Sequence, residues 1–191
     1  EIVLTKTGLP INGEPHLEPW LNFLHRMKNA TKTVRIGLVG KYVELPDAYK
    51  SINESLFQAA TYNDRKLDLQ YIHSEKLNSG NVDAMLSSLD GVLIAPGFGQ
   101  RGIEGKFIAL KYAREHDIPT FGVCLGMQCM VIEYARDVLG YTDANSTEMD
   151  VTTKHNVIDL MEEQKSITNM GGTMRLGAYD CILAEDSIAA K

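Results

Sequence analysis

The stretch that decides the fold of this chain is residues 119–136, PTFGVCLGMQCMVIEYAR. Its short apolar run at 121–123 (FGV) predicts a strand. The residues from Leu125 onward predict a helix, because apolar side chains recur there at helical spacing, at Met127, Met130, Val131 and Tyr134. A strand that leads directly into a helix is the repeating unit of an α/β fold.

Between this strand and helix, residues 122–126 read G-x-C-x-G, the layout of a nucleophile elbow. Because Gly122 and Gly126 lack Cβ atoms, the chain can turn sharply and place Cys124 at the tip of the turn. The unpaired N–H groups and the dipole of a helix N-terminus favour the thiolate form of such a cysteine. We therefore interpret Cys124 as a nucleophile, and Cys129 and Cys181 as small buried hydrophobic residues.

Composition limits the class of protein. With 191 residues, of which 44% are hydrophobic, the chain can form one α/β domain with a core and an appendage. A net charge of −6 argues against nucleic acid as a partner. The sequence lacks both a long apolar run and a signal-peptide pattern, so we expect a soluble cytoplasmic protein with no membrane partner. The cysteine spacing fits neither a zinc site nor a disulfide framework, so no metal is expected.

Strands and helices alternate along most of the chain. Apolar runs predict strands at residues 34–40, 67–72, 91–95 and 120–123. Helices are expected from Pro46 onward, with Asp47 as the cap, over 81–89 and over 104–116. The inner face of the first is expected to consist of Ile52, Leu56, Ala59 and Ala60. This alternation predicts an α/β fold with a doubly wound, mostly parallel, flavodoxin-like sheet and right-handed crossovers.

The two ends of the chain are less regular. Residues 1–33 contain repeated prolines and glycines, which predict a linker with one amphipathic helix at 20–28. After Gly140 the alternation stops. We expect a short strand at 157–160, a second strand at 178–183, and a final helix that begins at Asp186.

The carboxyl ends of the parallel strands are the expected binding site. Gly97 follows the strand 91–95, and Cys124 follows the neighbouring strand 120–123, so both border one crevice. The N–H groups of Gly97 and Leu125 would then converge on a carbonyl that Cys124 attacks, which is the arrangement of an oxyanion hole. Gly97 alone is more typical of a turn, but its place beside the elbow favours the donor role.

A cysteine nucleophile usually needs a histidine base that a carboxylate orients. The chain has five histidines, at positions 16, 25, 73, 116 and 155. His73 ends the second strand, away from the strand of Cys124, and His116 lies at the opposite end of the sheet. None is a convincing base, so the catalytic triad is incomplete in this chain.

With these residues identified, residues 34–191 resemble the class I glutamine amidotransferase domain of the CTP synthases. Five blocks carry the resemblance: GKYVELPDAYKSI (40–52), APGFGQRGIEGK (95–106), GVCLGMQ (122–128), NSTE (145–148) and GGTMRLG (171–177). The G-x-C-x-G pattern alone would indicate only class I amidotransferases or related hydrolases, such as the γ-glutamyl hydrolases. The five blocks in this order are specific to CTP synthases. Residues 1–33 then resemble a linker and the end of a preceding synthetase domain.

The resemblance implies a glutamine-hydrolysing ligase of pyrimidine biosynthesis. Cys124 would attack the side-chain amide of L-glutamine, release ammonia, and leave a thioester that water hydrolyses. The ammonia would pass to a synthetase domain that converts UTP to CTP with ATP and Mg, while GTP acts as effector. The full-length enzyme is expected to be a tetramer, and the amidotransferase domain needs no cofactor of its own.

The resemblance also implies roles for single residues. Gly97 and Leu125 would form the oxyanion hole, and Gln128 would touch the substrate from the first turn of the helix. Glu148 would bind the α-ammonium group of glutamine, and Arg175 its α-carboxylate, as charge-assisted hydrogen bonds favour.

Two departures from the family pattern matter. Where the family often has Pro-Gly-Gly-Phe-Gly, residues 95–99 read APGFG; Pro96 has no N–H, but Gly97 keeps its own. The His-x-Glu of the family triad is expected beyond residue 191, so the domain 34–191 is C-terminally incomplete. An alternative function is therefore a glutamine-binding module that docks on a partner without turnover.

Overall fold

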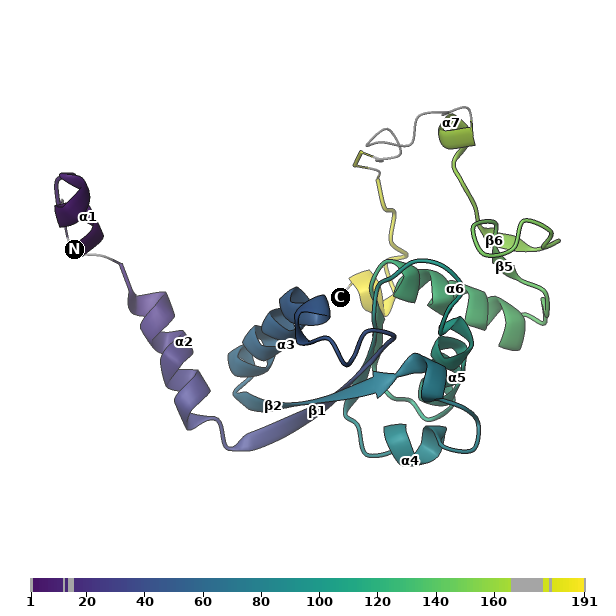
Figure 1. The fold of residues 1–191 in the computed structure, drawn as a ribbon, viewed down its shortest axis with the longest axis horizontal. Coiled ribbons are helices and arrows are strands. Elements are labelled where there is room, and N and C mark those ends of the chain that lie inside the picture. Colours follow the sequence, from purple (N-terminus) through teal and green to yellow (C-terminus); the bar gives the residue numbers. More distant parts are fainter. Residues whose placement is uncertain (1, 12, 14–15, 166–176, 179, 191) are drawn as a thin grey trace.

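The computed structural model describes residues 2–11, 13, 16–165, 177–178 and 180–190. Its central sheet has four parallel strands in the order β2-β1-β3-β4 (Figure 1). These strands are β1 (Lys32–Gly40), β2 (Arg65–His73), β3 (Gly91–Ile94) and β4 (Thr120–Gly122). The predicted parallel sheet is confirmed. β2 lies beyond β1, away from β4, as predicted for the strand that ends in His73.

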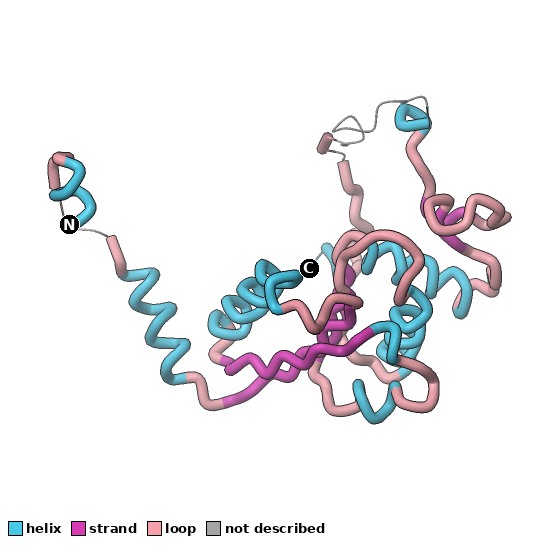
Figure 2. Tube along the Cα trace, viewed as in Figure 1, coloured by secondary structure: helices cyan, strands magenta, loops and turns pink. Residues whose placement is uncertain are grey.

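Helices cover both faces of the sheet (Figure 2). One face carries α4 (Val82–Leu86), α5 (Ile103–Glu115) and α6 (Leu125–Asp137), and the other carries the 3-10 helix η1 (Pro46–Tyr49) and α3 (Lys50–Tyr62). Because side chains alternate along a strand, Val39 packs into the core cluster with α5 and α6, whereas its neighbour Leu38 packs into the cluster with Tyr49. The doubly wound arrangement is confirmed.

The predicted helix after Cys124 is confirmed as α6, and a set of residues other than those that indicated it makes up its buried face. Leu125, Cys129 and Ile132 are buried and join the core. Three of the four residues whose spacing indicated the helix are exposed: Met127 at 48%, Val131 at 40% and Tyr134 at 50%. Both sets have helical spacing, so periodicity could not tell which one faces the sheet. The fourth, Met130, is partly buried against the core.

The start of α3 also differs from the prediction. Asp47 does not cap the helix, because it lies inside η1, whose N-cap Leu45 makes no side-chain capping bond. Ile52 and Leu56 pack against the core and Ala60 is buried, as predicted, but Ala59 is exposed. The chain enters α3 through this 3-10 turn, and Ala59 lies at the edge of the inner face that the other three residues form.

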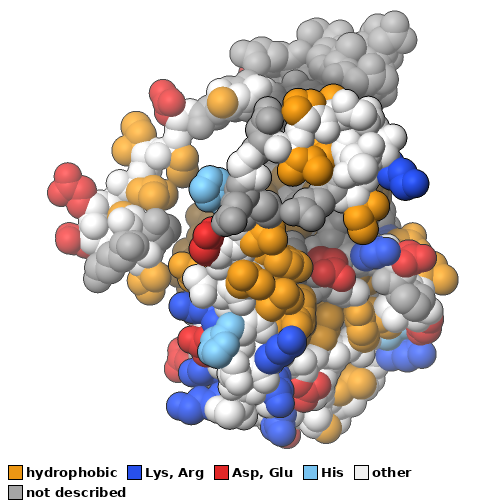
Figure 3. Space-filling model, turned by 90° about the vertical axis from the view of Figure 1, so that its left-hand side faces the viewer, with side chains coloured by type: hydrophobic (Ala, Val, Ile, Leu, Met, Phe, Trp, Pro, Cys, Tyr) orange, Lys and Arg blue, Asp and Glu red, His pale blue; other side chains and the backbone are white. Residues whose placement is uncertain are grey.

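The N-terminal helices α1 (Ile2–Thr7) and α2 (Glu18–Asn29) project from the sheet (Figure 1). α2 confirms the predicted amphipathic helix, whereas α1 was not expected. α2 contacts α3 through Phe23 and Phe57, whose ring centroids are 6.2 Å apart, and leaves Trp20 56% exposed. Figure 3 views the molecule from this side and shows hydrophobic side chains on the surface. No helix of the described residues is long and apolar enough to cross a membrane.

The C-terminal third forms small elements outside the main sheet. The strands β5 (Asn145–Ser146) and β6 (Asn156–Ile158) pair with each other, and a single turn of helix, α7 (Glu162–Lys165), follows. The expected strand at 178–183 is wrong for its described residues, which have no regular structure. Asp186 lies in a turn before the 3-10 helix η3 (Ile188–Ala190), and Cys181 is exposed rather than buried.

An ion pair joins α5 to α6. Arg114 Nη2 donates to Glu133 Oε1 at 2.7 Å, and the Glu133 side chain is 4% exposed. We expect Arg114→Met to lower the free energy of unfolding by about 3 kcal/mol, because it leaves a buried carboxylate unpaired. Urea unfolding measures this change.

A matched control lies on the same helix. Lys111 pairs with Asp137 at 3.2 Å, but its side chain is 49% exposed. Lys111→Met is therefore expected to cost less than about 1 kcal/mol. If Arg114→Met and Lys111→Met lose the same free energy of unfolding, the burial of Glu133 does not make its ion pair stronger than the exposed one.

Candidate active site

The backbone of Cys124 has the strained conformation of a nucleophile elbow. Cys124 lies between β4 and α6 with φ 54° and ψ −112°. Residues other than glycine rarely adopt positive φ, and such strain gathers at functional sites. The Cys124 side chain is exposed at the N-terminus of α6. The elbow expected from the sequence is therefore present, with its thiol open to a ligand.

The two glycines of the elbow are required by close packing. A Cβ on Gly126 would lie 2.2 Å from the Ile94 carbonyl oxygen, and a Cβ on Gly122 would lie 2.5 Å from the Met127 nitrogen. The elbow is also tied to the neighbouring strand, since the Val123 N–H donates to the Ile94 oxygen at 3.1 Å. The turn thus holds Cys124 directly beside the carboxyl end of β3.

Gly97 lies against the elbow, as expected. It follows β3, and β3 pairs with β4. A Cβ on Gly97 would lie 3.7 Å from Leu125 Cδ2, which places the two residues in contact range. Within the part of the chain that the structure describes, neither the Gly97 N–H nor the Leu125 N–H donates to another protein group. Two free donors therefore border the carboxyl ends of β3 and β4.

Two buried lysines hold the loop on either side of Gly97, and sequence reasoning missed both. Lys106 Nζ donates to the Ala95 oxygen at 2.6 Å, and Lys41 Nζ donates to the Phe98 oxygen. Lys106 is 1% exposed and Lys41 is 7% exposed. The only available signal for Lys106 was its place among the apolar residues of α5, next to Phe107.

Of the other predicted residues, Gln128 and Glu148 can be placed. Gln128 is half-buried in the first turn of α6, and its N–H donates to the Cys124 oxygen at 3.1 Å. Glu148 is exposed in the segment 145–150, and its side chain has no protein partner among the described residues. Arg175 lies outside the described residues.

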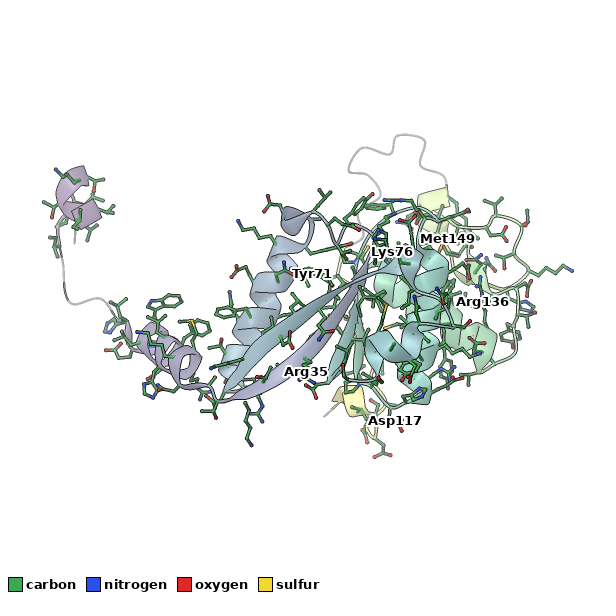
Figure 4. The ribbon with its side chains drawn as sticks, turned by 60° about the horizontal axis from the view of Figure 1, so that its bottom comes forward. Arg35, Tyr71, Lys76, Asp117, Arg136 and Met149 are labelled. Carbon is green, nitrogen blue, oxygen red and sulfur yellow. The ribbon has the colours of Figure 1, made fainter. Side chains whose placement is uncertain are left out.

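The segment that carries Glu148 is tethered at its next residue. Met149 is buried in the core beside α5 and α6, and Gln100 Nε2 donates to its carbonyl oxygen. Met149 and Gln100 also line a pocket of about 410 Å³ with Arg136. Figure 4 labels two of these lining residues, Met149 and Arg136. Because Gln100 follows Gly97 by three residues, it links the loop of the Gly97 donor to the Glu148 segment.

Three of the five histidines have partners other than Cys124. His73 Nε2 lies 3.5 Å from a Glu44 carboxylate oxygen, and the ring of His116 stacks on a tyrosine. His155 Nδ1 lies 2.6 Å from Asp143 Oδ1, and this hydrogen bond lowers the pKa of Asp143. No hydrogen bond of the described residues joins a histidine to Cys124.

The second cysteine of α6 is a poor nucleophile. Cys129 is fully buried, and burial raises the pKa of its thiol to about 11. At neutral pH this thiol is protonated and closed to ligands. The exposed Cys124 is the thiol of α6 that can react.

Comparison with known proteins identifies the family of this chain. The class-I glutamine amidotransferase family matches residues 44–190. The CTP synthase of Bacteroides fragilis ATCC 25285 is 68% identical over 187 residues, and that of Porphyromonas gingivalis W83 is 62% identical over 187 residues. Both matches cover 98% of this chain, and the chain spans only 35% of the length of these relatives.

A solved structure resembles the chain as well. It is the glutaminase domain of the Trypanosoma brucei CTP synthase with bound acivicin. The two chains are 41% identical with a TM-score of 0.63, and the match covers 68% of this chain and 51% of the other.

Proposed function

Because this chain belongs to the class I glutamine amidotransferase family, we propose that it hydrolyses L-glutamine to glutamate and ammonia as the amidotransferase part of a CTP synthase. The observation that carries the proposal is the elbow itself. Cys124 has φ 54° at the head of α6, with the free N–H groups of Gly97 and Leu125 beside it.

The reaction follows from this geometry. Cys124 Sγ attacks the side-chain amide carbon of glutamine, and the electron pair of the carbonyl moves to its oxygen. The N–H groups of Gly97 and Leu125 stabilise that oxyanion; in such sites the loss of one donor costs about 2.7–4 kcal/mol. The electron pair of the oxyanion then re-forms the carbonyl as the C–N bond breaks, and the leaving NH₂ group takes up the proton that the thiol lost and departs as ammonia. Water hydrolyses the remaining thioester to glutamate and returns the free thiol of Cys124.

Recognition of the amino-acid end of glutamine falls to two charges. Glu148 would bind the α-ammonium group, because its carboxylate is exposed next to the anchored Met149 and has no partner among the described residues. Arg175 would bind the α-carboxylate through its planar guanidinium. Gln128, one turn after Cys124, would contact the reacting side chain.

The wider assignment rests on the relatives, which are about three times as long as this chain. Residues 1–33 would be a linker and the end of a synthetase domain, and residues 34–191 the amidotransferase domain. The synthetase domain would use the ammonia, ATP and Mg to convert UTP to CTP in the cytoplasm, with GTP as effector and a tetramer as the assembly. The triad histidine and glutamate would come from outside residues 1–191.

Covalent labelling by acivicin, the ligand of the trypanosomal domain, tests this proposal. We expect acivicin to modify Cys124, as located by peptide mass spectrometry, and glutamine to protect it. Glu148→Gln is expected to raise the acivicin concentration for half-maximal labelling roughly tenfold or more, since a hydrogen bond to a charged group contributes about 1.5–3 kcal/mol.

Glu162→Gln is the matched control, because the Glu162 side chain is 87% exposed and pairs only with Lys165 in the structure described. Its labelling curve should match that of the wild type. If glutamine does not reduce acivicin labelling of Cys124, the assigned site is wrong. The same holds if Glu148→Gln does not change the acivicin concentration for half-maximal labelling.

A further inference from the structure

Lys106 is a buried ammonium group without a carboxylate. It lies in the first half of α5 with 1% of its surface exposed, among the largest fully buried side chains of the described residues. None of the ion pairs in the described ranges includes it. Lysine is almost never fully buried unless it is paired, because removing an ammonium from water is costly. Its position therefore requires an explanation other than stability.

The hydrogen-bond partner of Lys106 lies at the active-site end of the sheet. The Lys106 Nζ donates to the Ala95 oxygen at 2.6 Å, immediately after β3. Burial lowers the pKa of Lys106, and the neighbouring ammonium of Lys41 adds to this shift. Among the described residues, the one hydrogen bond of the Lys106 side chain goes to this backbone oxygen, two residues before Gly97.

This hydrogen bond acts on the loop that presents the Gly97 N–H. The proline ring fixes φ of Pro96 near −65°, and Pro96 has no N–H of its own. The direction of the Gly97 N–H then depends on how the Ala95–Pro96 peptide is held and on the one free torsion of Pro96. Lys106 holds the Ala95 carbonyl on one side, and Lys41 holds the Phe98 carbonyl on the other.

We propose that Lys106 is a positioning residue for glutamine hydrolysis: by holding the Ala95 carbonyl it keeps the Gly97 N–H directed at the oxyanion. The inference rests on the proposed function and deepens it. Lys106 touches neither the substrate nor Cys124 in this role. It acts through the peptide geometry of residues 95–97.

Two reagents separate this role from a purely structural one. Acivicin reacts when Cys124 Sγ adds to its chlorine-bearing C=N carbon: the C–S bond forms, negative charge builds on the ring nitrogen, and chloride leaves. The Gly97 donor can stabilise that charge. Iodoacetamide reacts by direct displacement, in which sulfur bonds to the CH₂ carbon as iodide departs, so no charge develops for the donor to stabilise. In both reactions the thiol proton goes to solvent.

The experiment compares wild type, Lys106→Met, Lys106→Gln and Lys111→Met. Methionine keeps most of the volume of lysine without a donor, whereas glutamine keeps a neutral donor. The exposed Lys111 provides the same substitution on the outer face of α5. Peptide mass spectrometry gives the labelling rate at Cys124, and the exposed Cys181 serves as an internal reference for iodoacetamide.

We expect Lys106→Met to slow saturated acivicin labelling about tenfold, as partial loss of one oxyanion donor implies. Iodoacetamide labelling should stay within twofold of wild type, Lys106→Gln should recover part of the acivicin rate, and Lys111→Met should match wild type. A folded Lys106→Met or Lys106→Gln variant with the wild-type acivicin rate would overturn the proposal. So would an equal slowing of both reagents, which would place the effect on the thiol instead. If acivicin does not label the wild type at all, the proposed function itself is wrong.

Discussion

Cys124→Ala is expected to lower the rate of ammonia release from glutamine by at least about 10⁴-fold in an enzyme that also carries the triad histidine proposed above, because removal of the nucleophile then leaves only binding and the oxyanion hole. Cys124 carries this effect alone, since the other thiol of α6, Cys129, is buried and protonated at neutral pH. The measurement is the initial rate of ammonia release at saturating glutamine.

Cys181→Ala is the control, because Cys181 is exposed and lies far along the chain from the elbow. It should release ammonia at the wild-type rate. Equal rates for wild type and Cys124→Ala would show that Cys124 is not the nucleophile. A wild-type chain that binds glutamine but releases no ammonia would support the alternative of a binding module without turnover.

The second large effect is on stability and concerns Gly105. A Cβ at this position would lie 1.7 Å from the Ser74 carbonyl oxygen and 2.7 Å from the Ser74 carbonyl carbon. Both are backbone atoms, so α5 or the 3-10 helix η2 (Ser74–Lys76) must move to accept any side chain. We expect Gly105→Ala to lower the free energy of unfolding by about 3 kcal/mol, the upper part of the range for overpacking.

The sign of this change is informative. Alanine is favoured over glycine in a helix by about 1 kcal/mol, so helix propensity alone predicts stabilisation. Urea unfolding decides between the two, with Gly177→Ala as the control because a Cβ there meets no atom of the described residues within 4 Å. A stabilised Gly105→Ala variant would show that α5 and η2 do not approach each other this closely.

The strand β3 was predictable because it is buried on both faces, whereas the edge strand β4 leaves Phe121 66% exposed. The run at 91–95 is apolar throughout and appears as β3 (Gly91–Ile94), within one residue of its expected end. The helical face of α6 was not predictable in the same way. Its sequence carries apolar residues at helical spacing on two sides, and only the approach of α5 and β3 determines that Cys129 and Ile132 are buried.

In the active site, too, local features could be predicted from the sequence, whereas long-range contacts could not. The sequence alone determined the elbow, because the absence of Cβ at Gly122 and Gly126 and the helix start after Cys124 are local properties of a few consecutive residues. It also placed Gly97 beside Cys124, since strand order brings their strands together. Only the tertiary structure decided that Lys106 is buried with its ammonium on the Ala95 carbonyl. It alone also showed that Gln100 anchors the segment of Glu148. Burial and long-range hydrogen bonds depend on segments that are distant in the chain, and a local sequence pattern does not predict which of these segments will be in contact.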